Sequence, residues 1–113
     1  MNYVGIDLHK RSTYVSVMNK EGELIMQKRV LTEPEELKLL LDRVPKPFSA
    51  VIEASRNWYW VYDLVEEIAE EVKLAHPPKT RLIAEARIKT DKIDSKILAD
   101  LLRTDYLPTC YVG

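Results

Sequence analysis

The stretch Asn2–Val30, NYVGIDLHKRSTYVSVMNKEGELIMQKRV, decides the fold. Residues 2–8 are rich in apolar and aromatic side chains. In residues 13–18, Thr13, Val15 and Val17 alternate with Tyr14, Ser16 and Met18. Successive side chains of a strand point to opposite faces, so this alternation predicts a half-buried strand. The turn residues NKEG at 19–22 lead into a third β-rich run, ELIMQKRV at 23–30. The stretch therefore predicts a three-stranded antiparallel meander.

A helix is predicted directly after the meander. Thr32 and Glu35 have the spacing of a capping box, and Pro34 suits the first helical turn. Apolar residues then follow with the helical period of 3.6: Leu37, Leu40, Leu41 and Val44. Pro45 and Pro47 end the helix.

Strands and helices alternate further along the chain. FSAVIEA at 48–54 is a short apolar run that suits a strand buried on both faces. A helix capped by Ser55 or Asn57 follows, then a strand at 72–75 and a short helix around Leu82–Ala86. Together with the helix described next, the order βββαβαβα predicts an α/β protein with a five-stranded mixed sheet.

Two aspartates, Asp91 and Asp94, stand three residues apart in KTDKIDSKILADLLR, residues 89–103. We expect a helix to begin near Asp91, with both carboxylates on the side that faces the core. Two inward negative charges repel each other and lose hydration, which a divalent cation would compensate. The alternative is that these acids only complement the helix dipole, which explains Asp91 better than Asp94.

Two more carboxylates lie in the apolar strand segments, Asp7 in YVGIDLH and Glu53 in FSAVIEA. Together the four acids form a set of oxygen ligands, which favours Mg²⁺ or Mn²⁺ over zinc. Carboxylates at the ends of adjacent strands can hold two such ions for phosphodiester chemistry. Taken singly, each strand acid has an alternative role, capping a loop or pairing with Lys10 or Arg56.

The composition limits the classes of function. The chain has 113 residues, with 17 Lys and Arg against 18 Asp and Glu and a net charge of -1, so it has no global field that attracts nucleic acid. The single cysteine, Cys110, excludes an internal disulfide and a cysteine zinc cluster. No apolar run is long enough to span a membrane. These features predict one domain in a reducing cytoplasm.

Five basic residues flank the aspartates in sequence and are candidates for binding a nucleic-acid backbone: Lys79, Arg81, Arg87, Lys89 and Lys92. Lys10 is a further candidate for a phosphate contact, and we expect His9 to point away from Asp7. For each basic residue a solvated surface position is the alternative. The aromatic residues Trp58, Tyr59, Trp60 and Tyr62 are predicted to be mainly core, with stacking on a base as the alternative.

Three blocks of the sequence resemble a known family: VGIDLHKRSTYVSV, VIEASRNWYW and KTDKIDSKILADLL. They are similar to the N-terminal RuvC-like domain of insertion-sequence transposases known for a DEDD tetrad. The strings Gly-Ile-Asp-x-His-Lys and Lys-Thr-Asp-x-x-Asp both occur intact. The order βββαβαβα also resembles the ribonuclease H-like fold. The resemblance implies that Asp7, Glu53, Asp91 and Asp94 are the family's catalytic, metal-binding acids.

The resemblance further implies a metal-dependent DNA transposase or recombinase of a prokaryotic mobile element. Residues 1–113 would be its RuvC-like catalytic domain, with residues 105–113 as a linker to a C-terminal domain that carries a serine nucleophile. DNA, a structured guide RNA and further copies of the full-length chain would be its partners. The chain by itself is then expected to be inactive.

Three alternatives remain open. A RuvC-type Holliday-junction nuclease would use the same acids with water as the nucleophile. An actin-like or sugar-kinase-type ATPase lobe would need glycines after Asp7, where the chain has His9, Lys10 and Arg11 instead. A non-catalytic module that docks RNA or protein would use the acids structurally.

Overall fold

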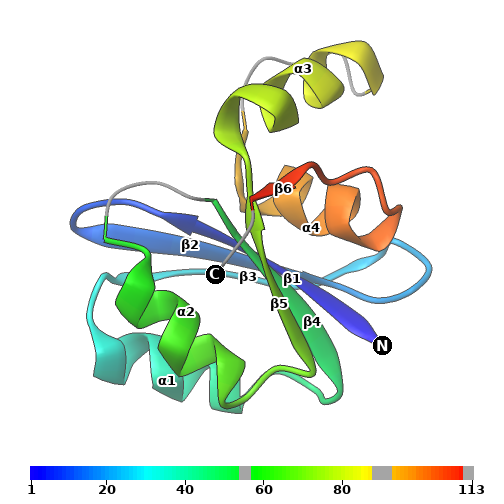
Figure 1. The fold of residues 1–113 in the computed structure, drawn as a ribbon. Coiled ribbons are helices and arrows are strands. Elements are labelled where there is room, and N and C mark those ends of the chain that lie inside the picture. Colours follow the sequence, from blue (N-terminus) through cyan, green and yellow to red (C-terminus); the bar gives the residue numbers. More distant parts are fainter. Residues whose placement is uncertain (54–56, 88–92, 111–113) are drawn as a thin grey trace.

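The computed structural model describes residues 1–53, 57–87 and 93–110, and it contains a mixed sheet with helices on both faces (Figure 1). The strand order is β3-β2-β1-β4-β5-β6. The meander consists of β1 (Asn2–Leu8), β2 (Ser12–Met18) and β3 (Leu24–Leu31), and β4 (Phe48–Glu53) and β5 (Glu71–Ala75) run parallel to β1. The predicted α/β class and its five mixed strands are confirmed.

The sixth strand was not predicted. β6 (Thr109–Cys110) has two residues and pairs antiparallel with the end of β5, where Ala75 faces Thr109. Part of the stretch 105–113, expected as a linker, therefore belongs to the sheet. Within the described ranges, no helix is long and apolar enough to cross a membrane.

One face of the sheet is covered by α1 (Pro34–Asp42) and α2 (Tyr59–Glu66), which lie together below the sheet in Figure 1. The leucines predicted by the helical period fill the space beneath α1, and Leu37 and Leu41 are fully buried. They pack in one apolar cluster with strand and α2 residues that include Ile6, Phe48, Ile52, Val61 and Val65. This cluster is the main core of the domain.

The other face is covered by α4 (Ser95–Arg103), which packs closely on β1. Gly5 makes this approach possible, because a Cβ at this position would overlap the carbonyl oxygen of Ser95 and lie 2.7 Å from the backbone nitrogen of Ala99. The hydroxyls of Ser16 and Ser95 form a buried hydrogen bond of 2.7 Å, and Gln27 donates to Ser16. A second, smaller apolar cluster lies under the rest of the helix: Val51, Ala75, Leu98 and Leu102.

Three predicted helix starts were wrong. α2 has Trp58 as its N-cap, with no side-chain cap, and not Ser55 or Asn57. α4 begins at Ser95 rather than near Asp91, because Asp94 has an extended backbone (φ -128°, ψ 179°) and caps the helix. The helix expected around Leu82–Ala86 is α3 (Pro77–Arg87), which begins earlier because prolines are tolerated in a first helical turn. It follows β5 and lies at the top of Figure 1.

The capping box at Thr32 and Glu35 was also wrong. Glu33 is the N-cap of α1 and makes no side-chain cap. The Thr32 hydroxyl instead donates to the carbonyl oxygen of His9 at 2.6 Å, and the Thr32 amide donates to the carbonyl oxygen of Arg11. Thr32 therefore holds the turn between β1 and β2 in place.

Candidate carboxylate site

Asp7 and Glu53 lie side by side at the carboxyl ends of two parallel strands. The register pairs Ile6 of β1 with Ile52 of β4, which makes Asp7 and Glu53 the next neighbours along the strands. Alternation along β1 places Asp7 on the same face as Gly5, the face that α4 covers. The Asp7 side chain is 14% exposed. In parallel sheets this edge is where ligands bind.

Burial raises the pKa of Glu53, and the neighbouring negative charge of Asp7 raises it further. The positive charge of Arg81, and to a smaller extent His9, acts in the opposite direction. The fold thus brings two carboxylates together where solvation is poor and the opposing positive charges do not fully compensate. A bound cation would relieve this repulsion.

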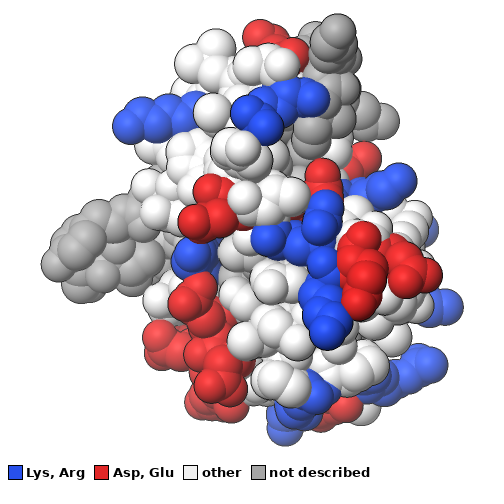
Figure 2. Space-filling model, turned by 90° about the vertical axis from the view of Figure 1, so that its right-hand side faces the viewer, with Lys and Arg blue, Asp and Glu red and all other residues white. Residues whose placement is uncertain are grey.

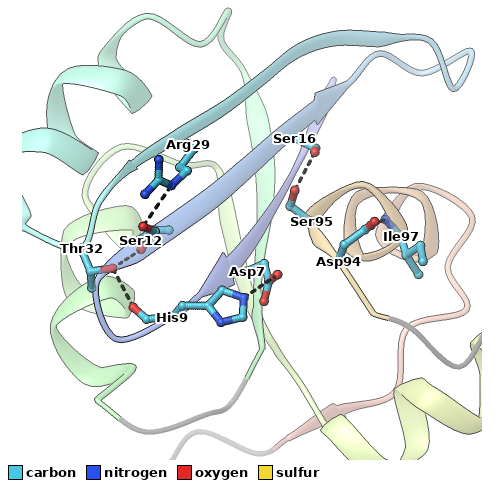
Figure 3. A network of polar contacts seen from close by, with 10 residues as sticks. Asp7, His9, Ser12, Ser16, Arg29, Thr32, Asp94, Ser95 and Ile97 are labelled. Carbon is cyan, nitrogen blue, oxygen red and sulfur yellow. Dashed lines mark hydrogen bonds and ion pairs between the residues drawn. The ribbon is translucent and has the colours of Figure 1, made fainter.

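A pocket of about 730 Å³ opens beside Asp7, and Asp94 lines it as well. Figure 3 shows the two aspartates on facing elements, Asp7 on β1 and Asp94 at the start of α4. Oδ1 of Asp94 accepts a hydrogen bond of 2.9 Å from the amide of Ile97. This N-cap position is compatible with the alternative, an acid that complements the helix dipole, but Asp94 also lines the same pocket as Asp7. Asp91 lies outside the described residues.

His9 was expected to point away from Asp7, and this was wrong. Its Nε2 lies 3.0 Å from Oδ2 of Asp7 (Figure 3). Residues i and i+2 of an extended chain point to the same side, so the period of two itself could have predicted this contact. The His9 ring also packs edge-on against Tyr14, with the ring centroids 5.6 Å apart.

The described ranges contain no group of three or more His, Cys, Asp or Glu side chains that is ready to hold a metal ion. Three of the four predicted acids have described positions: Asp7 and Glu53 are adjacent, and Asp94 shares the pocket with Asp7. The structure thus places Glu53 and Asp94 each near Asp7, with no preformed cluster among the described residues.

The predicted basic residues are in different settings. Lys10 lines the pocket, together with Arg11 from the same turn. The positive charge of Arg81 lowers the pKa of Glu53, against the larger effect of burial. The Arg87 guanidinium lies 3.7 Å from the centre of the Tyr106 ring. Lys79 is exposed on α3, and Lys89 and Lys92 lie outside the described residues. Figure 2 shows acidic and basic side chains interspersed on the described part of one face.

The aromatic group after Glu53 is mainly core, as predicted. Trp58, Trp60 and Tyr62 are partly buried against the main core. Tyr59 is 68% exposed, and its ring stacks on Trp58 with a centroid distance of 4.0 Å.

Comparison with known proteins defines the class of this chain. It matches the family model DEDD_Tnp_IS110, described as a transposase, over residues 4–111. The chain therefore belongs to this transposase family, and the resemblance drawn from the three sequence blocks is confirmed. A comparison with curated proteins gives no match.

Among solved structures, the chain is similar to the inorganic polyphosphate/ATP-glucomannokinase from Arthrobacter sp. strain KM. The two are 17% identical with a TM-score of 0.49, and the match covers 80% of this chain and 50% of the kinase. The chain thus spans about half the length of that structure.

Proposed function

We propose that the chain is the catalytic domain of a DNA transposase or recombinase with a ribonuclease H-like, RuvC-like fold. Asp7, Glu53 and Asp94, together with Asp91, would hold Mg²⁺ or Mn²⁺ for phosphodiester strand transfer. One observation carries the proposal: in a member of a transposase family, Asp7 and Glu53 are neighbours at the carboxyl ends of parallel strands, and Asp94 lines the same pocket as Asp7.

The chemistry of these residues fits divalent metal. The predicted ligands are all carboxylate oxygens, the donors that Mg²⁺ and Mn²⁺ prefer. The raised pKa of Glu53 supports this fit, because its causes, burial and the Asp7 charge, are conditions that a cation relieves. When bound, the metal would activate the attacking oxygen and stabilise charge on the phosphate.

The other residues of the site would orient these acids and bind the substrate. His9 contacts Oδ2 of Asp7 and would fix the rotation of that carboxylate. Lys10 lines the same pocket and would contact a phosphate. Five residues further along the chain would contact the nucleic-acid backbone: Lys79, Arg81, Arg87, Lys89 and Lys92.

A metal titration tests the proposal. Mn²⁺ should raise the melting temperature, because a cation that binds only the folded state stabilises it by mass action. Asp7→Asn should remove most of this gain. Asp63→Asn is the matched control, since Asp63 is exposed on α2, the helix that covers the opposite face, and should leave the gain unchanged. An undiminished gain in Asp7→Asn would place the metal elsewhere.

The family resemblance also implies a serine nucleophile in a C-terminal domain, a guide RNA and assembly of several full-length copies, and we include these in the proposal. The 113-residue chain should then bind duplex DNA weakly, since its net charge of -1 releases few counterions, and should not cleave it. Supercoiled and branched DNA with Mn²⁺ test this. Robust cleavage that disappears in Asp7→Asn would favour a RuvC-type nuclease instead.

A further inference from the structure

A row of four side chains runs across the sheet from the acids to the edge strand. Asp7 pairs with Tyr14, and Tyr14 pairs with Arg29, so these residues are neighbours on β1, β2 and β3. Glu53 extends the row on the other side of Asp7. Directly paired residues point to the same face, here the face that α4 covers. Adjacent strands are about 4.8 Å apart, so Tyr14 and Arg29 lie about 5 and 10 Å from Asp7 along the row.

Tyr14 is an aromatic residue exposed beside the acids. It is 41% exposed and lines the same pocket as Asp7 and Asp94. Its ring packs edge-on against His9, which in turn contacts the Asp7 carboxylate. Tyr3, on the same face of β1 as Asp7, instead packs in the smaller apolar cluster. Tyr14 is therefore placed to contact a ligand that reaches Asp7.

Lys10 and Arg11 line this pocket, and Arg29 bonds Ser12, which also lines it. Lys10 and Arg11 are exposed at the tip of the turn between β1 and β2, which Thr32 holds through the Arg11 carbonyl oxygen. Arg29 is also exposed, and its Nε donates to the hydroxyl of Ser12 at 3.1 Å (Figure 3). This bond fixes the direction of the guanidinium and leaves its terminal nitrogens for an acceptor.

We propose that a DNA strand with an unpaired base lies along this row. With its reacting phosphate at Asp7 and Glu53, the neighbouring base stacks on Tyr14 and the next phosphate binds Arg29. The order of groups, acids then aromatic ring then cation, matches the alternation of phosphates and bases along a single strand. Stacking on an aromatic side chain requires a base that is not paired in a duplex. This inference rests on the proposed function and specifies its substrate.

A binding assay on the whole chain tests the role of Tyr14. The probe is a single-stranded DNA oligonucleotide carrying 2-aminopurine, compared with the same oligonucleotide in a duplex, at low salt with Mn²⁺ present. The single strand should bind more tightly. Tyr14→Leu should weaken single-strand binding about tenfold, given the usual contribution of one stacked base, and Tyr14→Phe should retain it.

Tyr59→Leu is the matched control for Tyr14, because Tyr59 is an exposed tyrosine on α2, the helix that covers the opposite face. It should bind as the wild type does. Equal binding by Tyr14→Leu and the wild type would overturn the proposal. So would a loss in Tyr14→Phe as large as in Tyr14→Leu, because the hydroxyl and not the ring would then be responsible.

Arg29 has its own control in Lys28, the preceding residue of the same strand. Lys28 pairs with the buried Val15, so its side chain is on the face of α1 and α2. Arg29→Gln should weaken binding and lower its salt dependence by about one ion, whereas Lys28→Gln should do neither. Equal losses in both variants would show a general charge effect and contradict a phosphate position at Arg29.

The Mn²⁺ shift in melting temperature shows whether this inference or the proposed function has failed. Tyr14→Leu should keep the Mn²⁺ shift of the wild type, since Tyr14 is not proposed as a ligand. If the wild type shows the shift but Tyr14 is dispensable for single-strand binding, only the strand path is wrong. If the wild type shows no shift, the metal site itself is wrong.

Discussion

The two faces of the sheet differ in what fills the space beneath their helices. The face covered by α1 and α2 is apolar and continuous, and side chains from four strands and both helices meet in one cluster. The face covered by α4 has a small apolar cluster at one end and polar side chains at the other, including Asp7, Ser16 and Ser95. The first face buries most of the apolar side chains, and the second positions the candidate site.

On the α4 face, the helix is held mainly by close backbone packing and a polar contact and less by buried apolar side chains. Gly5 brings the backbone of β1 against α4, and the bond between Ser16 and Ser95 fixes the first turn of that helix. Asp94 directly precedes this turn. Its distance from Asp7 therefore depends on contacts that contribute little to the apolar core.

The largest expected effect is the loss of stability caused by a substitution in the main core, on the face covered by α1 and α2. Leu41→Ala should lower the free energy of unfolding by about 2–5 kcal/mol, because Leu41 is fully buried and the substitution leaves a cavity. Leu39→Ala, in the same helix but 67% exposed, should change it by less than about 0.5 kcal/mol. Chemical denaturation measures both. Similar losses in the two variants would contradict the assignment of the main core to this face.

Gly5→Ala should have the next largest effect, and here stability and metal binding change together. The new methyl group overlaps the Ser95 carbonyl oxygen, so α4 must move, at a cost of about 1–3 kcal/mol. Movement of α4 displaces Asp94, and the Mn²⁺ shift should fall. Gly22→Ala is a control at a turn glycine with a φ of +84°, where a Cβ would lie nearest the Arg103 guanidinium, at the end of α4 opposite to Asp94: it should destabilise the chain but keep the shift. If Gly5→Ala kept the full Mn²⁺ shift in melting temperature, the position of α4 would not matter for metal binding.

The sequence predicted the strands better than the helix ends. The meander and the strand at 48–54 follow from alternation and apolar runs, which depend on many residues at once. Helix starts depend on single side chains with competing partners. Thr32 has the capping-box spacing, but its hydroxyl bonds His9, a residue 23 positions away. β6 has only two residues, too few for any periodicity.

For the site, the sequence predicted that Asp7 and Glu53 are close but not how they are held. Asp7 and Glu53 end adjacent strands, which alternation and topology predict. The contact between His9 and Asp7 follows from the period of two of an extended chain, so the sequence contains the signal for it. The row from Asp7 through Tyr14 to Arg29 depends on the strand register, which a single sequence does not specify to the residue.

The smallest expected effect is the pH dependence caused by Glu53. Since the pKa of Glu53 is raised above 4.5 in the fold, the folded chain retains a proton that the unfolded chain releases, and stability falls as pH rises through that window. Glu53→Gln should therefore be slightly more stable than the wild type at neutral pH without metal. The advantage should vanish below about pH 4.5. Thermal melts across pH measure it, and a difference independent of pH would exclude this cause.

The central claim is that Asp94 acts with Asp7 in one metal site and does not merely cap α4. Asn is as good an N-cap as Asp, so Asp94→Asn keeps the bond to the Ile97 amide and removes only the charge. Titration with Mn²⁺, followed by calorimetry, tests the claim most directly. The account predicts an unchanged melting temperature without metal and Mn²⁺ affinity at least tenfold weaker than in the wild type. Wild-type affinity in Asp94→Asn would contradict it and leave Asp94 as a helix cap.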